Sequence, residues 1–324
     1  MKPFSQVFFY APLSAILLMG VILLFQAPAS VEAASFTLGT GNYDRSLKSG
    51  GLDRQYAVHV PRSYNPGQPT PVILNFHGGG GNSESQKKIS MMDQASERYG
   101  FIVVYPQGTG AKLRLINPKG FTWNAGSCCG YAMKQQIDDV GYTRALLDDL
   151  ERQFNVDKKR VFATGISNGA MMCFRLACQL SDRIAAIAPV AGTMGVSGCN
   201  PSRPVSVIYF HGTDDKFVPV GGGKGPRSLP GESFESVDQT IAFWRRQDKV
   251  PDTPKVVKRG QATGSYYGPG ADGSEVAVWL IQGGGHTWPG GQFGFLGKRI
   301  LGAMTQDISA NDLMWEFFQR HPLK

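Results

Sequence analysis

The sequence has few of the residues on which metal and nucleotide chemistry depend. Histidine is scarce, with 5 residues among 324, and no HExxH motif is present to bind a catalytic zinc ion. There is no G-x-x-x-x-G-K-[ST] phosphate loop, and no G-x-G-x-x-G segment has an acidic residue at the spacing that a dinucleotide site requires. The sequence therefore predicts neither a metal ion nor an organic cofactor.

Long hydrophobic runs are also absent, except for one near the N-terminus. Residues 7–25 form an uncharged apolar run after Lys2, and the small residues Val31 and Ala33 follow at the −3 and −1 spacing of a signal-peptidase site. We expect residues 1–33 to be a signal peptide and the mature chain to be extracellular or periplasmic. Because the run approaches the length of a membrane span, an uncleaved anchor is the alternative.

Acidic residues are outnumbered by basic ones. The 33 lysines and arginines exceed the 25 acidic residues and give a formal net charge of +8. Such an excess can attract anionic partners, but it is also typical of ordinary solubility, which composition alone favours. We therefore expect no nucleic-acid partner and, after cleavage of the signal peptide, no membrane partner.

Cysteine is scarce and odd in number, with 5 residues in the chain. In an oxidising compartment most of them should pair. Cys173 and Cys178 would point about 140° apart around a helix axis, so they should not bridge each other. A Cys128–Cys129 bridge would need a strained eight-membered ring. We expect a Cys178–Cys199 disulfide with Cys173 as a buried free thiol, and the cysteine spacings fit no zinc site.

From residue 52 onward, short apolar runs alternate with helical patterns. The apolar runs predict strands at residues 55–61, 71–81, 101–108, 160–165, 184–192, 204–212 and 276–284. Helices are predicted at residues 90–100, 138–154, 168–180, 237–247 and 308–320, with Asp138 as the N-cap of the second. This alternation predicts an α/β fold: one domain over residues 34–324, built on a mostly parallel sheet with helices on both faces.

The strongest local signal is GISNG at residues 165–169, a G-x-S-x-G between a predicted strand and a predicted helix. This is the context of a nucleophile elbow, in which the turn is so tight that bulky residues at the glycine positions would clash. The hydroxyl of Ser167 would stand at the end of the strand, where the helix dipole stabilises developing negative charge. The pattern predicts that Ser167 is a nucleophile.

A serine nucleophile needs a general base, and in this kind of fold the chain order is serine, acid, histidine. His286 alone lies downstream of an acid, after a predicted strand and within the glycine-rich segment QGGGHTWPGG. The positions of the other histidines suit the base less well: His59, His77, His211 and His321. The acid should follow residues 204–212, where Asp214 and Asp215 both fit and spacing alone does not choose.

The segment NFHGGGGNS at residues 75–83 ends another predicted strand. In this fold that loop supplies one backbone N–H to the oxyanion hole, and the residue after the nucleophile supplies the other. We expect Gly79, with Gly78 as the alternative, and Asn168 to be these donors.

With these segments the chain resembles the secreted α/β-hydrolase esterase family of polyhydroxybutyrate depolymerases, feruloyl esterases and acetyl-xylan esterases. The resemblance extends from about residue 36 to the C-terminus and rests on LNFHGGGGN, CCG followed by DDVGYTRALLDDL, RVFATGISNGAMMCFRLAC, HGTDDKFVP and GGGHTWPGG. It implies an α/β-hydrolase fold and a serine carboxylester hydrolase that needs no cofactor. The family's HGT-x-D-x-x-VP pattern implies that the acid is Asp215, and its GHxWPG element implies that the base is His286.

The substrate is less well defined than the reaction. His77, Trp123 and Trp288 are candidate substrate contacts, with a buried anchoring role as the alternative for the tryptophans. Basic residues in the loops predict a cationic rim around the site, which would favour an anionic polymer such as polyaspartate. The alternative is that these long side chains are simply solvated. They are Lys112, Arg114, Lys119, Lys134, Lys216, Lys224, Arg227, Lys298 and Arg299. We expect an ester substrate, polymeric or linked to a plant polysaccharide, with an acyltransferase as the second enzymatic possibility. A binding protein on a hydrolase scaffold is disfavoured because Ser167, Asp215 and His286 are all present.

Overall fold

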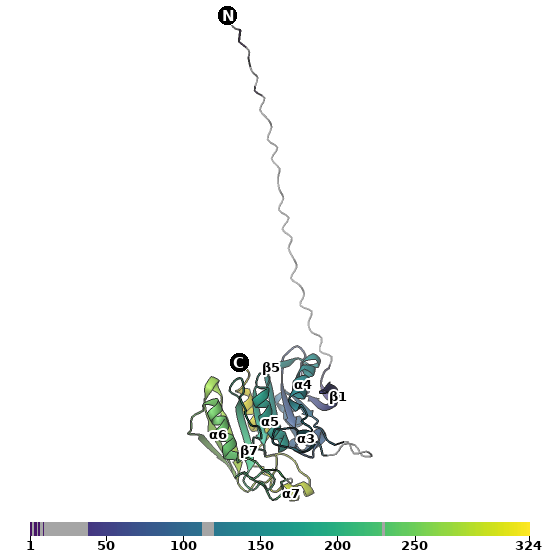
Figure 1. The fold of residues 1–324 in the computed structure, drawn as a ribbon, viewed down its shortest axis with the longest axis vertical. Coiled ribbons are helices and arrows are strands. Elements are labelled where there is room, and N and C mark those ends of the chain that lie inside the picture. The colour runs from purple at the N-terminus through teal and green to yellow at the C-terminus, as the bar shows by residue number, and fades with distance from the viewer. Residues whose placement is uncertain (2, 5, 7–8, 10–37, 112–119, 229–230) are drawn as a thin grey trace. The chain divides into compact units, whose positions relative to one another are not determined.

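The computed structural model describes residues 1, 3–4, 6, 9, 38–111, 120–228 and 231–324 (Figure 1). The chain divides into Met1–Ser35 and Phe36–Lys324, and the second unit carries the helices and strands described below. The expected signal-peptide cleavage site and the rim residues Lys112, Arg114 and Lys119 lie outside the described residues. Within the described part of the chain, no helix is both long and apolar enough to cross a membrane.

A single twisted sheet organises the second unit. Its strand order is β1-β2-β4-β3-β5-β6-β7-β10-β9-β8 over the described residues. The strands are β1 (Gly41–Ser49), β2 (Leu52–Val60), β3 (Thr70–Phe76), β4 (Ile102–Pro106), β5 (Val156–Ile166), β6 (Ala186–Val190), β7 (Ser206–Gly212), β8 (Lys255–Arg259), β9 (Ala262–Tyr267) and β10 (Val276–Ile281). Neighbours from β4 to β10 pair in parallel, whereas β1, β2, β8 and β9 pair antiparallel. The prediction of a mostly parallel sheet is confirmed.

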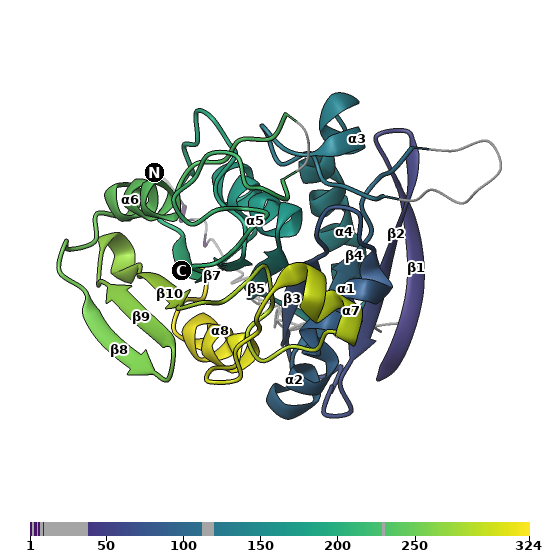
Figure 2. The same ribbon diagram turned by 90° about the horizontal axis from the view of Figure 1, so that it is seen from below.

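Helices cover both faces of this sheet, as Figure 2 shows with α4, α5 and α6 on one side and α2 and α8 on the other. The helices are α1 (Ser83–Ser90), α2 (Met92–Tyr99), α3 (Gly130–Lys134), α4 (Asp139–Gln153), α5 (Asn168–Gln179), α6 (Val237–Asp248), α7 (Phe295–Leu301) and α8 (Ala310–Gln319), with a 3₁₀ turn at Ala271–Gly273. Asp138 caps α4 as expected, because its side chain accepts a hydrogen bond from the Gly141 N–H at 2.8 Å.

One predicted helix begins later than expected. The pattern at residues 90–100 predicts one continuous helix, but α1 ends at Ser90 and α2 starts at Met92. Met91 lies between them with φ 53°, a left-handed conformation that no α-helix accommodates. Side-chain periodicity does not reveal such a break, because Met91 itself is a good helix former.

The apolar runs are buried because both faces of the sheet are covered. Every residue of β3, β4, β6 and β7 is buried. On one face, the rings of Phe162 and Phe318 stack with centroids 4.3 Å apart, which fixes α8 against β5. On the other face, Phe174 of α5 packs against Trp244 of α6 at 6.2 Å.

The cysteine pairing agrees with one expectation and corrects another. Cys178 is bonded to Cys199, and Cys173 is a buried free thiol, as predicted. The expectation that Cys128 and Cys129 do not bridge was wrong, because the structure pairs them. Both cysteines are buried in the loop that leads into α3.

The parallel strands bring distant segments to one edge of the sheet. Phe76 at the end of β3 lies beside Gly165 near the end of β5, and Ile281 at the end of β10 lies beside Gly212 at the end of β7. The loops that follow these four strands carry the residues that the sequence singles out. This edge is where a ligand site is expected in such a sheet.

Candidate active site

Ser167 occupies the sharp turn between β5 and α5. Its backbone has φ 58° and ψ −123°, which a residue with a side chain rarely adopts. The Ser167 N–H donates to the Val190 carbonyl at 2.8 Å, and the Ser167 carbonyl accepts from Met171 N–H at 3.0 Å. The turn therefore leaves the side chain partly exposed at the N-terminus of α5. This is the nucleophile-elbow geometry that the G-x-S-x-G pattern predicts.

The glycines on each side of Ser167 are required by close backbone packing. A Cβ atom at Gly165 would lie 2.6 Å from the Phe76 carbonyl oxygen, which is closer than real side chains approach. A Cβ atom at Gly169 would meet the same carbonyl and that of His77. The elbow is thus wedged against the end of β3, and a larger residue at either position would push the two segments apart.

His286 and Asp215 are joined by a hydrogen bond of 2.7 Å between Nδ1 and Oδ2. His286 follows β10 and is fixed by its own backbone, whose N–H donates to the Leu301 carbonyl at 2.7 Å. Asp215 follows β7, and its Oδ1 accepts from the Phe217 and Val218 N–H groups at 2.8 and 2.9 Å. The Phe217 ring lies 5.0 Å from the imidazole of His286. Both oxygens of the carboxylate are therefore occupied, and the imidazole is held in one orientation.

The environment of Asp215 keeps it ionised. Burial is the largest influence and raises the pKa of its carboxyl, but the charge and hydrogen bond of His286, the charge of His211 and the Val218 N–H together outweigh burial, so that the net pKa is lowered. His211 lies next to it, with Nε2 3.7 Å from Asp215 Oδ2. Burial lowers the pKa of His211, which is placed between the Tyr209 hydroxyl at 2.6 Å and the Val218 carbonyl at 2.8 Å. His211 thus supports the loop of Asp215 through its contacts with Tyr209 and Val218.

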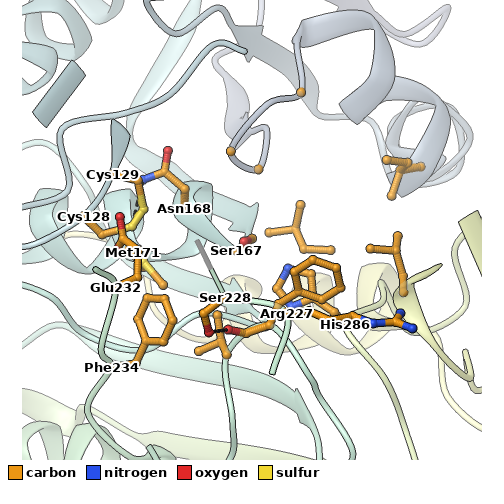
Figure 3. A pocket seen from close by; sticks show the side chains of 18 of the residues that line it. Cys128, Cys129, Ser167, Asn168, Met171, Arg227, Ser228, Glu232, Phe234 and His286 are labelled. Carbon is orange, nitrogen blue, oxygen red and sulfur yellow. Dashed lines mark hydrogen bonds between the residues drawn. A yellow bond between two sulfur atoms is a disulfide. The ribbon is translucent and has the colours of Figure 1, made fainter. Parts of the chain in front are cut away.

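Within the described residues, no hydrogen bond joins Ser167 Oγ to His286, although both side chains line the same cavity (Figure 3). Such contacts are often long in the absence of a substrate. Nδ1 of His286 is occupied by Asp215, so Nε2 is the nitrogen available to the serine.

The loop after β3 lies against the elbow. A Cβ atom at Gly79 would be 3.7 Å from the Asn168 Cβ, and one at Gly78 would be 3.3 Å from the Ser167 Cβ. Among the described residues, neither the Gly79 nor the Asn168 N–H has an acceptor. The Asn168 side chain is held by Trp123, whose N–H donates to Oδ1 at 2.7 Å. Two unpaired N–H groups therefore lie next to the serine.

The structure gives His77 and the two tryptophans packing positions outside the cavity lining. His77 is buried, its Nε2 accepts from Gly108 N–H at 3.0 Å, and its Nδ1 donates to the Gly78 carbonyl at 2.8 Å. Burial lowers the pKa of His77 to about 4, which keeps the ring neutral. Trp123 Nε1 donates to the His77 carbonyl at 2.9 Å, and Trp288 Nε1 to Asn311 Oδ1 at 3.0 Å. These contacts support the loops around the serine.

A cavity of about 270 Å³ opens over Ser167. Its wall is mostly apolar and combines residues of three helices with residues of several loops that have no regular sequence pattern. The helical residues are Ile89, Met171 and Leu301, and the loop residues are Cys128, Cys129, Phe217, Val218, Arg227, Glu232, Phe234 and Phe293. Met171, Glu232 and Phe234 line the cavity but were not predicted from the sequence. Met171 is one helical turn after Ser167, and this spacing could have indicated it. The loop residues carry no comparable signal.

Of the described residues of the expected cationic rim, Arg227 alone lines the cavity. It is exposed and donates a hydrogen bond to the Ile300 carbonyl. Within the described chain, one cluster has metal-ligating residue types, namely Cys128, Cys129 and Glu232, whose ligand atoms lie within 4.8 Å of one another. Because the two sulfurs are bonded to each other, they cannot act as thiolate ligands.

Comparison with known proteins identifies the family. A family model described as phospholipase/carboxylesterase matches residues 63–238, which is more than half of the chain and includes Ser167 and Asp215. The chain belongs to the phospholipase/carboxylesterase family. The protein is a carboxylic ester hydrolase, as its similarity to curated feruloyl esterases also indicates.

Curated relatives of this phospholipase/carboxylesterase-family protein include two feruloyl esterases. Feruloyl esterase B of Piromyces equi is 30% identical over 75% of this chain, but the match covers 44% of that protein. Feruloyl esterase D of Neurospora crassa is 28% identical over 93% of this chain and 96% of its own length. More than half of the length of feruloyl esterase B therefore lies outside the match.

Solved structures agree on the fold. An acetyl xylan esterase from Aspergillus awamori matches 86% of this chain and 99% of its own with a TM-score of 0.59 at 16% identity. An S-formylglutathione hydrolase from Agrobacterium tumefaciens matches 87% of this chain and 95% of its own with a TM-score of 0.53 at 12% identity. The expected α/β-hydrolase fold is confirmed.

Proposed function

We propose that this esterase is a secreted enzyme in which Ser167 is the nucleophile, His286 the general base and Asp215 the acid that orients the base. One observation carries the proposal: the 2.7 Å hydrogen bond from His286 Nδ1 to the buried Asp215 carboxylate, beside the cavity that Ser167 lines. That bond directs Nε2 toward the reaction and stabilises the imidazolium that forms during it. The chain order serine, acid, histidine supports the same assignment.

The reaction then proceeds in two halves. His286 Nε2 takes the proton of Ser167 as Oγ attacks the ester carbonyl carbon, and the carbonyl oxygen becomes an oxyanion. When the tetrahedral intermediate collapses, the C–O bond to the alcohol breaks and His286 returns the proton to the departing alcohol. Water, deprotonated by the same imidazole, hydrolyses the acyl-enzyme and restores Ser167.

We assign the oxyanion hole to the backbone N–H groups of Gly79 and Asn168. Support comes from their position next to the serine and from the absence of any acceptor for either group in the described residues. The Asn168 N–H also belongs to the first turn of α5, where the helix dipole favours negative charge. Removing one such donor typically slows ester hydrolysis by about 10²–10³-fold.

Feruloyl-type esters are the substrate class that we favour. Two relatives that match most of this chain are named feruloyl esterases. An acetyl group would leave most of a cavity of about 270 Å³ unfilled, whereas an aromatic acyl group would bury apolar surface against its walls. The mostly apolar walls give the repeated ester groups of a polyester few polar partners, so we rank polyester oligomers lower.

A substrate panel with a serine variant tests the proposal. The panel compares methyl ferulate, acetylated xylan, hydroxybutyrate oligomers and polyaspartate, with wild type and Ser167→Ala assayed together. We expect methyl ferulate to be hydrolysed and Ser167→Ala to lose at least about 10⁴-fold in kcat, because the nucleophile is absent. A fluorophosphonate probe should label the wild type and not the variant, whose melting temperature should stay unchanged. Hydrolysis that survives Ser167→Ala would refute the mechanism.

Export is the second part of the proposal. It is supported by the apolar run at residues 7–25, by the small residues Val31 and Ala33, and by disulfides that persist in oxidising compartments. Expression of the full chain in a bacterial host, with N-terminal sequencing of the protein outside the cytoplasm, should give Ala34 as the first residue. A product that keeps Met1 and sediments with membranes would instead identify an anchor.

A further inference from the structure

Side chains that line the cavity lie on both sides of Ser167 (Figure 3). His286 and Arg227 lie on one side of the serine, whereas Cys129, Glu232 and Phe234 lie on the other. Asn168 and Met171 of α5 are on this second side as well. We call the side of His286 the first arm and the side of Glu232 the second arm.

The proposed reaction decides which part of the ester occupies each arm. His286 donates its proton to the departing alcohol, so the alcohol must lie beside the imidazole, in the first arm. The acyl group stays bonded to Ser167 while water enters from the histidine side. It therefore extends into the second arm.

The second arm is mostly apolar, and it contains one carboxylate. Its walls are the Phe234 ring, the Met171 thioether and the bonded sulfurs of Cys128 and Cys129. Glu232 is the sole aspartate or glutamate among the described residues that line the cavity, and one of its carboxylate oxygens lies within 4.8 Å of both sulfurs. Apolar walls suit an aromatic ring, and a carboxylate among such walls needs a hydrogen-bond donor.

The surroundings of Glu232 do not supply this hydrogen-bond donor. The side chain is partly buried and makes no hydrogen bond or ion pair with any other described residue. Burial raises the pKa of the Glu232 carboxyl, and the charge of Lys134 opposes this rise only in part. A partly buried carboxylate without a partner is stabilised by a hydrogen-bond donor, and a hydroxyl group can supply one.

We propose that Glu232 is a specificity residue that accepts a hydrogen bond from a hydroxyl group at the far end of an aromatic acyl group. The enzyme would thereby select esters of hydroxylated aromatic acids over esters of the same acids without the hydroxyl. This inference rests on the proposed function, because it takes the acyl group to be bonded to Ser167.

The test uses a pair of substrates that differ in one group, methyl 4-hydroxycinnamate and methyl cinnamate. For the wild type we expect kcat/KM to be at least about 10-fold higher for the hydroxylated ester, because only this ester can donate a hydrogen bond to the Glu232 carboxylate. Glu232→Ala should bring the ratio close to one, and Glu232→Gln, which keeps a neutral acceptor, should give an intermediate ratio. Glu235→Gln is the matched control: this exposed glutamate does not line the cavity and should leave the ratio unchanged.

The possible outcomes separate this inference from the proposed function. If Glu232→Ala keeps the wild-type ratio while Ser167→Ala is inactive, the function stands and the specificity role is refuted. If Ser167→Ala hydrolyses both esters, the proposed function itself fails. A pair of aliphatic esters, methyl 3-hydroxybutyrate and methyl butyrate, distinguishes the source of the hydroxyl. A Glu232-dependent preference that occurs only in the aliphatic pair would overturn the assignment to aromatic acids.

Discussion

Two neighbouring aspartates illustrate how much the environment of a single residue decides. Asp214 and Asp215 follow the same strand, yet the side chain of Asp214 is 60% exposed and that of Asp215 is fully buried. Asp214 pairs with Lys216 at 2.6 Å, a surface ion pair that contributes little. Asp215 receives two backbone N–H groups and the His286 imidazole. Spacing in the sequence leaves both aspartates open, and family resemblance alone selected Asp215.

The matched substitutions Asp215→Asn and Asp214→Asn test this difference. Asparagine at 215 can donate to His286 Nδ1 and would stabilise the tautomer whose Nε2 carries the proton, so the base could no longer accept from Ser167. We expect kcat for methyl ferulate to fall about 10³–10⁴-fold in Asp215→Asn and to stay within about twofold of wild type in Asp214→Asn. Equal losses in the two variants would contradict the assignment of Asp215.

At the scale of the element, α5 links the proposed nucleophile to a disulfide. Ser167 precedes the first turn of this helix, and Cys178 in its last turn is bonded to Cys199 at a sequence separation of 21. The disulfide therefore lies at the end of the helix away from the serine. It restricts the unfolded chain far more than it shapes the site.

Replacing both cysteines in Cys178→Ser/Cys199→Ser should destabilise the fold and spare the chemistry. For a closed loop of this length, we expect the free energy of unfolding to fall by about 3 kcal/mol. Urea unfolding without reductant measures this loss, while kcat for methyl ferulate at 25 °C should remain near the wild-type value. If the variant unfolds at the wild-type urea concentration, the disulfide does not restrict the unfolded chain as inferred.

The elements differ in how well the sequence predicts them. The central parallel strands and α4, α5 and α8 are predictable, because burial on both faces of a strand or on one face of a helix leaves a periodic pattern. The hairpin of β8 and β9 was not predicted: β8, with the sequence KVVKR, is mostly exposed and owes its place to pairing with β9. The second arm of the cavity was missed for a related reason, since Glu232 and Phe234 lie in a loop without periodicity.

At the scale of the whole molecule, the proposed site depends on the sheet. Ser167, Asp215 and His286 follow β5, β7 and β10, whose carboxyl ends share an edge because the strands are parallel. The sequence could predict this convergence from strand order and motif, because a parallel sheet leaves few other arrangements. It could not predict the shape of the cavity, which depends on how loops of irregular structure pack over that edge.

The stability of the whole molecule should depend on Asp248, a residue that does not line the cavity. This carboxyl ends α6 and is fully buried, with Oδ1 accepting from Val205 N–H at 3.2 Å and Oδ2 unpaired among the described residues. Burial raises its pKa from 3.8 to about 7. The folded state therefore holds this proton more tightly than the unfolded state, and stability is lost as the pH rises from about 4 to about 7.

Asp248→Asn should remove that loss. Asparagine keeps the acceptor for Val205 and carries no charge, so wild type and variant should unfold at similar urea concentrations at pH 4, where the wild-type carboxyl is protonated. Above pH 8 the variant should be more stable, by up to about 4 kcal/mol if each pKa unit contributes about 1.4 kcal/mol. Asp252→Asn is the control, because that side chain is 98% exposed and should give the same pH dependence as wild type. If the difference between wild type and Asp248→Asn does not change between pH 4 and pH 8, Asp248 does not titrate in this range and its ionisation does not limit the stability of the fold.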